Sequence, residues 1–171
     1  MIVVTGGAGF IGSAIAQELN MRGRMDLLIV DDINHPEKEK NITSIKYQEL
    51  RGINSFLGKI IERDINSIEA IIHMGACSST TETDEKFLIK NNYHYTRHLA
   101  TYALEKGIRF IYASSAATYG SGEMGYSDDE SKLNKLKPLN FYGESKHKFD
   151  IWAESQGILD RVVGLKYFNI F

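Results

Sequence analysis

The chain has 171 residues, of which 43% are hydrophobic and 25% charged, and this length and composition are typical of one globular domain with a single core. Its formal net charge of -2 and its pI of about 6.2 exclude an electrostatic attraction to nucleic acid or to an anionic membrane. The single cysteine excludes an internal disulfide, and no segment has the roughly 20 apolar residues of a membrane helix. We therefore expect a cytoplasmic protein without a nucleic-acid or membrane partner.

Short apolar segments alternate along the chain with segments that have the period of an amphipathic helix. The apolar segments predict strands at residues 1–5, 26–32, 68–74, 109–115 and 161–170, and a weaker strand at 45–50. The helical period predicts helices at residues 10–23, 53–63, 84–106 and 140–156, and the polar stretch 120–138 predicts a long loop. Apolar strands that alternate with helices are typical of a parallel sheet covered on both faces. The predicted fold class is therefore α/β, with a doubly wound parallel sheet.

The first predicted strand runs directly into the glycine-rich segment "TGGAGFIG", which opens the first predicted helix. In this segment Gly6, Gly9 and Gly12 recur at every third position. Such glycines permit a tight turn and a close approach of the backbone to a pyrophosphate, whose charge the helix N-terminus favours. The alternative is a tight strand-to-helix turn without a ligand. The context of strand, loop and helix favours the first interpretation, so residues 1–171 are predicted to form one Rossmann-type dinucleotide-binding domain.

An acidic residue, Asp31, ends the second predicted strand, about 20 residues after the glycine loop. A carboxylate at this place can accept a hydrogen bond from the adenine ribose of the cofactor, which favours NAD. Lys38 in the following loop could instead pair with the 2′-phosphate of NADP, or it could be an ordinary solvated lysine. The residues alone leave the choice between NADP and NAD open.

Three polar side chains form a candidate catalytic group. Ser115 ends the fourth long apolar strand, at the end where open α/β sheets bind ligands. Tyr142 and Lys146 have i, i+4 spacing in a predicted helix, so both side chains lie on one face. Tyrosine in water has a pKa of about 10, and a nearby ammonium and a cationic nicotinamide both favour its phenolate. We predict that Tyr142 is the catalytic base and that Ser115 holds the substrate oxygen.

The motifs "GGAGFIG", "YASSAATYG", "YGESK" and "KYFNIF" occur in the order found in the extended short-chain dehydrogenase/reductase family of nucleotide-sugar enzymes, which the whole chain resembles. The resemblance implies a bound NADP, with NAD possible. Asn91 falls in the middle of the apolar face of its predicted helix. The resemblance implies cofactor contacts from Gly6, Gly9, Phe10, Ile11, Gly12, Asp31, Asp32, Lys38, Gly75, Ala76, Cys77, Ser78, Asn91, Lys146 and Ile170. It implies substrate contacts from Ser79, Thr80, Ser115 and Asn169.

The only cysteine lies in the segment "GACSSTTETD", which contains the most specific part of this resemblance. Cys77 has no histidine close in sequence to act as its base and no second cysteine for a metal site, so neither a nucleophile nor a metal ligand is predicted. His94 and His98 have helical i, i+4 spacing but no evident third ligand. We expect the backbone around Cys77 to line the cofactor, and we expect no metal.

The resemblance also implies an activity, which is the inversion of C6 of an ADP-linked heptose by transient oxidation with bound NADP, in the synthesis of lipopolysaccharide core precursors. A related nucleotide-sugar 4-epimerase or dehydratase is the alternative within the family. A dinucleotide-binding fragment without turnover is the alternative from another class. The family's second acid/base is a lysine shortly after the position of Asn169, within a C-terminal part that includes a substrate domain, and we expect both to lie beyond Phe171. The full-length protein is expected to be a homo-oligomer.

Overall fold

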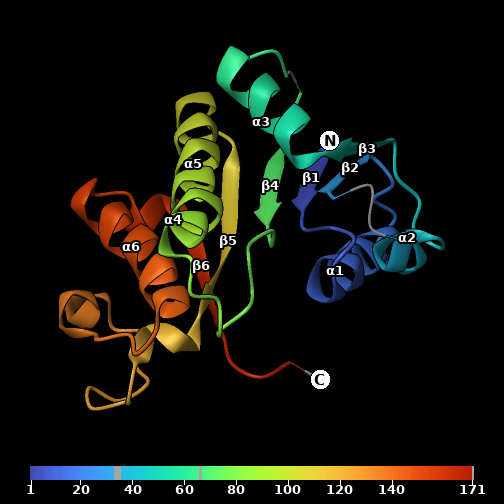
Figure 1. Ribbon diagram of the computed structural model, residues 1–171. Coiled ribbons are helices and arrows are strands. Elements are labelled where there is room, and N and C mark those ends of the chain that lie inside the picture. The colour runs from blue at the N-terminus through green and yellow to red at the C-terminus, as the bar shows by residue number, and fades with distance from the viewer. Residues whose placement is uncertain (33–35, 66, 171) are drawn as a thin grey trace. The chain divides into compact units, whose positions relative to one another are not determined.

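The strands form the parallel sheet that the apolar pattern predicts. The computed structural model describes residues 1–32, 36–65 and 67–170, so Phe171, where the motif "KYFNIF" ends, lies outside the described residues. In the sheet the strands are ordered β3-β2-β1-β4-β5-β6 (Figure 1), and the pairs β1–β2, β1–β4 and β2–β3 are parallel. The strands are β1 (Ile2–Thr5), β2 (Leu27–Asp31), β3 (Glu49–Gly52), β4 (Ala70–His73), β5 (Arg109–Ser115) and β6 (Val162–Tyr167). The predicted fold class, a doubly wound α/β sheet, is confirmed.

The helices are α1 (Phe10–Met21), α2 (Pro36–Ile42), α3 (Ile53–Glu62), α4 (Glu85–Leu88), α5 (Tyr95–Lys106) and α6 (Phe141–Ser155). A π-helical turn (Ile89–His94) joins α4 to α5. Short 3₁₀ segments lie at Ala116–Tyr119, Glu130–Lys135 and Leu159–Arg161. Among the described helices, none is both long and apolar enough to cross a membrane.

The described residues group into two compact units. The first unit contains Met1–Gly75 and His98–Ile111, and the second contains Ala76–Arg97 and Tyr112–Phe171. The first unit therefore holds the glycine loop, and the second holds the candidate catalytic group. Each unit is described by itself below.

The core of the first unit lies on both faces of strands β1 and β2. On one face, Ile2, Val4, Leu27 and Ile29 form a buried cluster with apolar side chains of α1 and α2, which include Ala16 and Ile42. On the other face, the alternate residues Val3, Leu28 and Val30 are also fully buried. Because successive side chains in a strand point to opposite faces, two covered faces require the unbroken apolar runs seen in the sequence.

The register of the first unit aligns the carboxyl ends of β1, β2 and β4 at one edge. Thr5 at the end of β1 lies opposite Val30 of β2 and His73 of β4. The Thr5 hydroxyl and His73 Nδ1 are 2.5 Å apart, and the Gly75 amide donates to Thr5 Oγ1 at 3.3 Å. The order of the strands reverses between β1 and β4, and this is the place where open α/β sheets bind their ligands.

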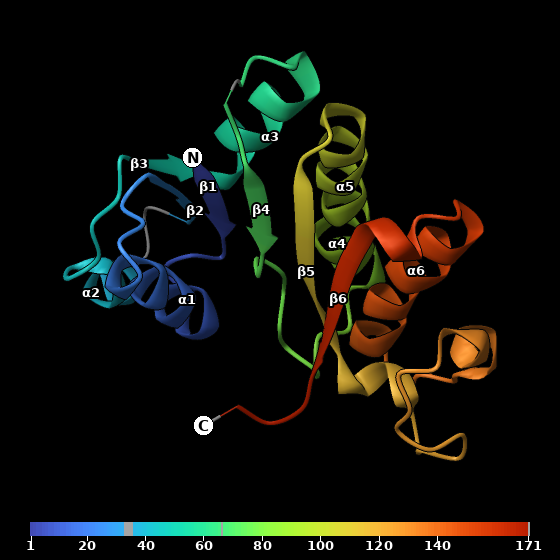
Figure 2. The same cartoon turned by 180° about the vertical axis from the view of Figure 1, so that it is seen from behind.

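In the second unit, α6 packs beside β6 and the carboxyl end of β5 (Figure 2). Asn140 caps α6, because its side-chain oxygen accepts a hydrogen bond from the Gly143 amide at 2.7 Å. Phe149 and Ala153 of α6 are buried, and the Tyr112 and Phe149 rings meet edge to face at 4.6 Å between centroids. The helix that carries Tyr142 and Lys146 is thereby fixed at its first turn and along its length.

The structure differs from the sequence-based prediction in four elements. The weak strand predicted at 45–50 corresponds to β3, which starts four residues later than predicted. The helix α2 was not predicted. The single helix predicted at 84–106 is divided by the π-helical turn. It starts where predicted, because the Asp84 carboxylate accepts from the Phe87 amide at 3.0 Å as an N-cap. The predicted loop 120–138 contains the 3₁₀ segment Glu130–Lys135.

Candidate functional site

The glycine loop follows β1 and brings its backbone very close to the segment after β4. Gly6 has φ +65, and a Cβ built there would lie only 2.6 Å from the Gly75 amide nitrogen. Any other residue at Gly6 would therefore be strained and would push these two segments apart. Gly9 is the N-cap residue of α1, and Gly12 is buried one turn into the helix. The loop thus leads tightly into the N-terminus of α1, where backbone N–H groups favour a negatively charged ligand such as a pyrophosphate.

The two residues that follow Gly9 differ in exposure. Phe10 is 66% exposed and Ile11 is half-buried. Their amides belong to the first turn of α1, where backbone N–H groups have no partner within the helix. The structure thus leaves both residues at the mouth of the glycine loop, where the resemblance places cofactor contacts.

Asp31 is buried at the end of β2 and holds the glycine loop through a hydrogen bond. Its Oδ2 accepts from the Ala8 amide at 2.8 Å, and its Oδ1 accepts from the Asp32 amide at 2.7 Å. Lys38 donates to the same Oδ1 at 2.6 Å, so Lys38 is an ion-pair partner of Asp31 rather than an ordinary solvated lysine. Asp31 and Lys38 line a cavity of 540 Å³ together with residues of α2 and β3. Asp32 is exposed at its edge.

The segment after β4 is held by an asparagine that the sequence analysis did not single out. Asn92 is 1% exposed, accepts from the Cys77 amide at 2.8 Å and donates to the Cys77 carbonyl at 3.0 Å. It also donates to Ser145 Oγ of α6 at 2.9 Å. Asn92 therefore joins the "GACSS" segment to the helix of the candidate catalytic group. Both hydrogen bonds between Cys77 and Asn92 use the backbone of Cys77 and not its thiol.

The expected position of Asn91 on the buried face of its helix is wrong. Asn91 is half-buried, and its amide donates to the Phe87 carbonyl at 2.8 Å on the exposed side of the helix. The neighbouring residue Asn92 takes the inward position within the π-helical turn. Helical spacing gave no signal that separates the two, because Asn91 is three residues and Asn92 four residues after Leu88, and both spacings belong to one helix face.

Ser115 ends β5 and caps the 3₁₀ turn Ala116–Tyr119. It is 8% exposed, and its Oγ accepts from the Ala117 amide at 3.1 Å. This bond fixes the oxygen and leaves the hydroxyl proton able to donate to a substrate oxygen. Gly143 of α6 lies against the same turn, since a Cβ built on Gly143 would be 2.8 Å from the Ala117 carbonyl oxygen. The glycine of "YGESK" thus lets the first turn of α6 approach the backbone beside Ser115.

Tyr142 and Lys146 lie on α6 with the predicted i, i+4 spacing, and both belong to the second unit. Tyr142 is half-buried, whereas Lys146 is only 4% exposed. Burial lowers the pKa of the Lys146 ammonium from 10.5 to about 8, and the negative charge of Asp150 partly opposes this shift. Lys146 is therefore a buried cation on the same helix face as the half-buried phenol of Tyr142.

The remaining predicted contacts lie in exposed segments of the second unit. Ala76, Ser78, Ser79 and Thr80 follow β4 and are exposed, and Ser79 Oγ lies 3.2 Å from Thr81 Oγ1. Asn169 and Ile170 follow β6 and are exposed as well. The structure thus gathers the predicted residues in two sets. Gly6, Gly9, Gly12, Asp31, Lys38 and Gly75 belong to the first unit, and Cys77, Ser115, Tyr142 and Lys146 belong to the second. Within the described residues, no group of histidine, cysteine and carboxylate side chains has the arrangement of a metal site.

Comparison with known proteins gives matches over the whole chain. The ADP-L-glycero-D-manno-heptose-6-epimerase of Nitratidesulfovibrio vulgaris (strain DP4) is 47% identical over 172 residues, which cover 100% of this chain and 53% of that protein. The solved structure of the enzyme of the same name from Helicobacter pylori has a TM-score of 0.83 at 29% identity and covers 99% of this chain and 55% of its own. A UDP-glucuronic acid 4-epimerase from Bacillus cereus, solved in complex with NAD, has a TM-score of 0.78 at 26% identity, over 99% of this chain and 57% of its own.

The chain spans about half the length of the curated relatives it matches. The family model described as "NAD dependent epimerase/dehydratase family" matches residues 2–171. This range contains the glycine loop, the end of β5 with Ser115, and α6 with Tyr142 and Lys146. The chain belongs to the NAD dependent epimerase/dehydratase family.

Proposed function

We propose that this chain is part of an ADP-L-glycero-D-manno-heptose 6-epimerase, which inverts C6 of the heptose in ADP-D-glycero-D-manno-heptose. The observation that carries the proposal is the identity of 47% with a protein of that name over 100% of the chain. This range includes the segment "GACSSTTETD", which contains the most specific part of the resemblance found in the sequence. The geometry supports the same reaction class, because it provides a dinucleotide cradle and a buried lysine on the helix of a candidate base.

The first unit has the features that would hold the pyrophosphate and the adenosine of a nicotinamide dinucleotide. The Gly6 backbone and the first turn of α1 would hold the pyrophosphate, since the glycines let the loop fold tightly against its own backbone at the helix N-terminus. Asp31 and Lys38 would lie at the adenosine ribose, beside the cavity between α2 and β3. When bound, the cofactor supplies a hydride acceptor that can return the hydride to the other face of the oxidised sugar.

The second unit has the groups that would move the proton. The Ser115 hydroxyl would donate a hydrogen bond to the C6 oxygen and hold that oxygen in place. Lys146 would stabilise the phenolate form of Tyr142 with its positive charge, and this phenolate would take the C6 hydroxyl proton as the hydride leaves and become a neutral phenol. Asn92, through Cys77 and Ser145, would hold the segment beside this group in place. Ser79, Thr80 and Asn169 would contact the sugar nucleotide.

The proposed cofactor is NADP, and Lys38 would be the residue that distinguishes it from NAD. Lys38→Ala should weaken NADP binding by about 10-fold or more, because a charge-assisted contact to the 2′-phosphate is lost. NAD binding should hold its value or improve, because Asp31 loses the ammonium at 2.6 Å and becomes free for a ribose hydroxyl. Fluorescence titration of both cofactors measures the two dissociation constants.

Lys40→Ala is the matched control for this comparison, because Lys40 is exposed on the same helix α2. It should change neither dissociation constant. An equal loss of affinity for both cofactors in Lys38→Ala would rule out the assignment of Lys38 to the 2′-phosphate.

The proposed activity is tested with the whole protein, NADP and ADP-D-glycero-D-manno-heptose. NMR of the heptose should show inversion at C6, and UDP-glucuronic acid under the same conditions should remain unchanged. Conversion of UDP-glucuronic acid with no conversion of the heptose would establish the related 4-epimerase function in place of the proposed one.

A further inference from the structure

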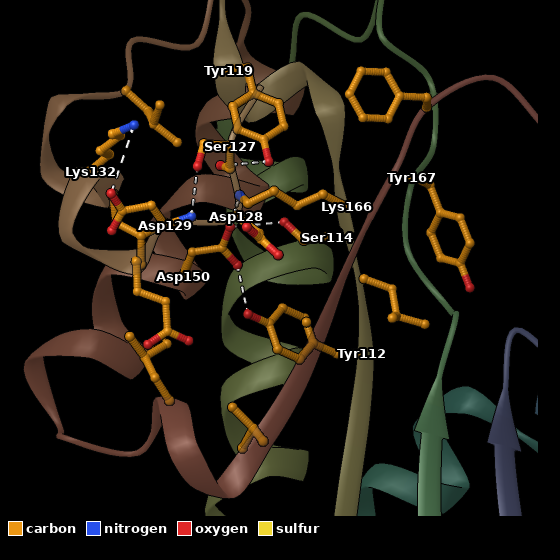
Figure 3. Close-up of a pocket in the computed structure, with 18 residues that line it drawn as sticks. Tyr112, Ser114, Tyr119, Ser127, Asp128, Asp129, Lys132, Asp150, Lys166 and Tyr167 are labelled. Carbon is orange, nitrogen blue, oxygen red and sulfur yellow. Dashed lines mark hydrogen bonds and ion pairs between the residues drawn. The ribbon is translucent and has the colours of Figure 1, made fainter. Parts of the chain in front are cut away.

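A buried carboxylate in the second unit joins three elements around the candidate catalytic helix. Asp150 of α6 is 2% exposed and lies one turn after Lys146. Its Oδ1 accepts from the Tyr112 hydroxyl of β5 at 2.8 Å, and its Oδ2 accepts from Ser114 Oγ of β5 at 2.9 Å. Lys166 of β6 donates to the same Oδ2 at 2.7 Å. Figure 3 shows these side chains together at a cavity of 470 Å³.

The hydrogen bonds fix the charge states of this cluster. Burial and the Asp150 charge raise the pKa of the Tyr112 phenol far above its usual range, so Tyr112 acts only as a donor. Lys166 also donates to Thr118 Oγ1 at 2.7 Å and lies 5.2 Å from the centroid of the Tyr119 ring. The cluster therefore holds one anion, Asp150, directly paired with one cation, Lys166.

A second cation lies one turn away, and it is the proposed catalytic lysine. Asp150 favours the ammonium form of Lys146, whereas burial disfavours it. In the Asp150–Lys166 pair the carboxylate side chain is 3% exposed and the ammonium side chain 19% exposed, so solvent screens these charges little. The negative charge of Asp150 thus stabilises two ammonium groups, Lys146 and Lys166. Each cation reduces the electrostatic stabilisation that the other receives.

We infer that Asp150 is a positioning residue, which ties the strand that ends at Ser115 to the helix of Tyr142 and Lys146 and acts as the shared counter-ion of Lys146 and Lys166. The part of Lys146 in catalysis rests on the proposed function, but the shared charge does not. Two consequences follow from the sharing. Loss of Asp150 should make Lys146 easier to deprotonate, and loss of Lys166 should make it harder.

Other charged and titratable groups face Asp150 from the elements around it. Tyr112 faces it from β5, Lys166 from β6 and Tyr119 from the 3₁₀ turn, and Glu130 acts on Tyr112 from the next 3₁₀ segment. Within α6, the charge of Asp150 acts on Lys146 and on His147. Burial lowers the pKa of His147, and the charges of Lys166 and Glu154 also act on it. Glu154 binds Asn134 through a hydrogen bond instead of joining the Asp150 cluster.

The experiment is an NMR titration of the lysine Cε resonances of the purified protein without cofactor. The Lys146 resonance is assigned by its loss in Lys146→Met. Asp150→Asn should move the titration midpoint of Lys146 down by about one pH unit, because a buried opposite charge is removed while the shape is kept. Lys166→Met should move it up by about half a unit or more, because Asp150 then acts on Lys146 without a competing cation.

Glu154→Gln is the matched control, because it removes a carboxylate from α6 outside the Asp150 cluster, and it should leave the Lys146 midpoint unchanged. A change of packing alone would not move the Lys146 midpoint down in Asp150→Asn and up in Lys166→Met. If Asp150→Asn does not fold, Lys166→Met alone decides, since only the upward shift agrees with a shared counter-ion. An unchanged or raised midpoint in Asp150→Asn, or an unchanged or lowered midpoint in Lys166→Met, would overturn the inference. A separate NADP titration of the unaltered protein tests the proposed function, so the two can fail independently.

Discussion

Tyr142→Phe should slow epimerisation of ADP-D-glycero-D-manno-heptose by about 100-fold or more in the whole protein, which is the typical contribution of a positioned acid/base. The substitution removes only the phenolic oxygen, and the half-buried ring at the first turn of α6 remains. Cofactor affinity should change little, because the glycine loop and Asp31 belong to the first unit and keep their contacts. The rate at saturating substrate and the NADP dissociation constant, measured side by side, separate chemistry from binding.

Tyr126→Phe is the control for the loss of a phenolic oxygen. Tyr126 is 63% exposed and lies in the long segment between β5 and α6, so this variant should keep the full rate. If Tyr142→Phe retained most of its activity, Tyr142 would not be the proton-transfer group.

Lys146→Met should stabilise the folded chain by about 3 kcal/mol at pH 7, at the expense of activity. One pKa unit corresponds to about 1.36 kcal/mol, so lowering the pKa of Lys146 from 10.5 to about 8 costs the folded state about that amount. A buried methionine of similar length carries no such cost. Urea unfolding followed by circular dichroism at several pH values measures the difference.

The pH dependence of this difference follows from the direction of the shift. Below pH 8 the lysine is protonated in both states, and the cost of the buried ammonium is fully present. Between about pH 8 and 10.5 the folded state loses the proton before the unfolded state does, so the stability of the unaltered chain rises with pH. The advantage of Lys146→Met should therefore disappear across this window. Lys148→Met, at an exposed position of the same helix, should show no such change, and an equal gain there would contradict the account.

Much of the fold was predictable, because it depends on patterns that are local in the sequence. The apolar runs located the strands, since two covered faces leave no polar position within Leu27–Val30. The helical period located the buried face at Leu88, Tyr95, Leu99 and Tyr102, all of which are buried in the structure. The glycine spacing predicted the tight loop after β1, and the structure shows why glycine is needed there. A side chain at Gly6 would collide with the backbone of Gly75.

The parts that were missed depend on contacts between residues far apart in sequence. The Asp31–Lys38 ion pair lies within a short span, but the sequence alone left open whether Lys38 is paired or solvated. Asp150 reads as an ordinary polar residue of α6 until Tyr112, Ser114 and Lys166 are brought to it. Asn91 and Asn92 lie on opposite flanks of one helix stripe, so periodicity alone gave no sharp choice between them. The contacts of Asn92 with Cys77 and Ser145 decide it.

The π-helical turn Ile89–His94 makes the helix sensitive to chain length at this point. Such a turn holds one residue more than an α-helical turn, so deleting one residue there would let α4 and α5 join as a regular helix. Because Asn92 lies within this turn, the deletion would change the direction in which its side chain leaves the helix and carry it away from Cys77. Substitutions at the exposed positions of the turn would be tolerated, whereas insertions and deletions would not. Relatives that keep the asparagine contact should therefore keep the number of residues between "GACSS" and α5.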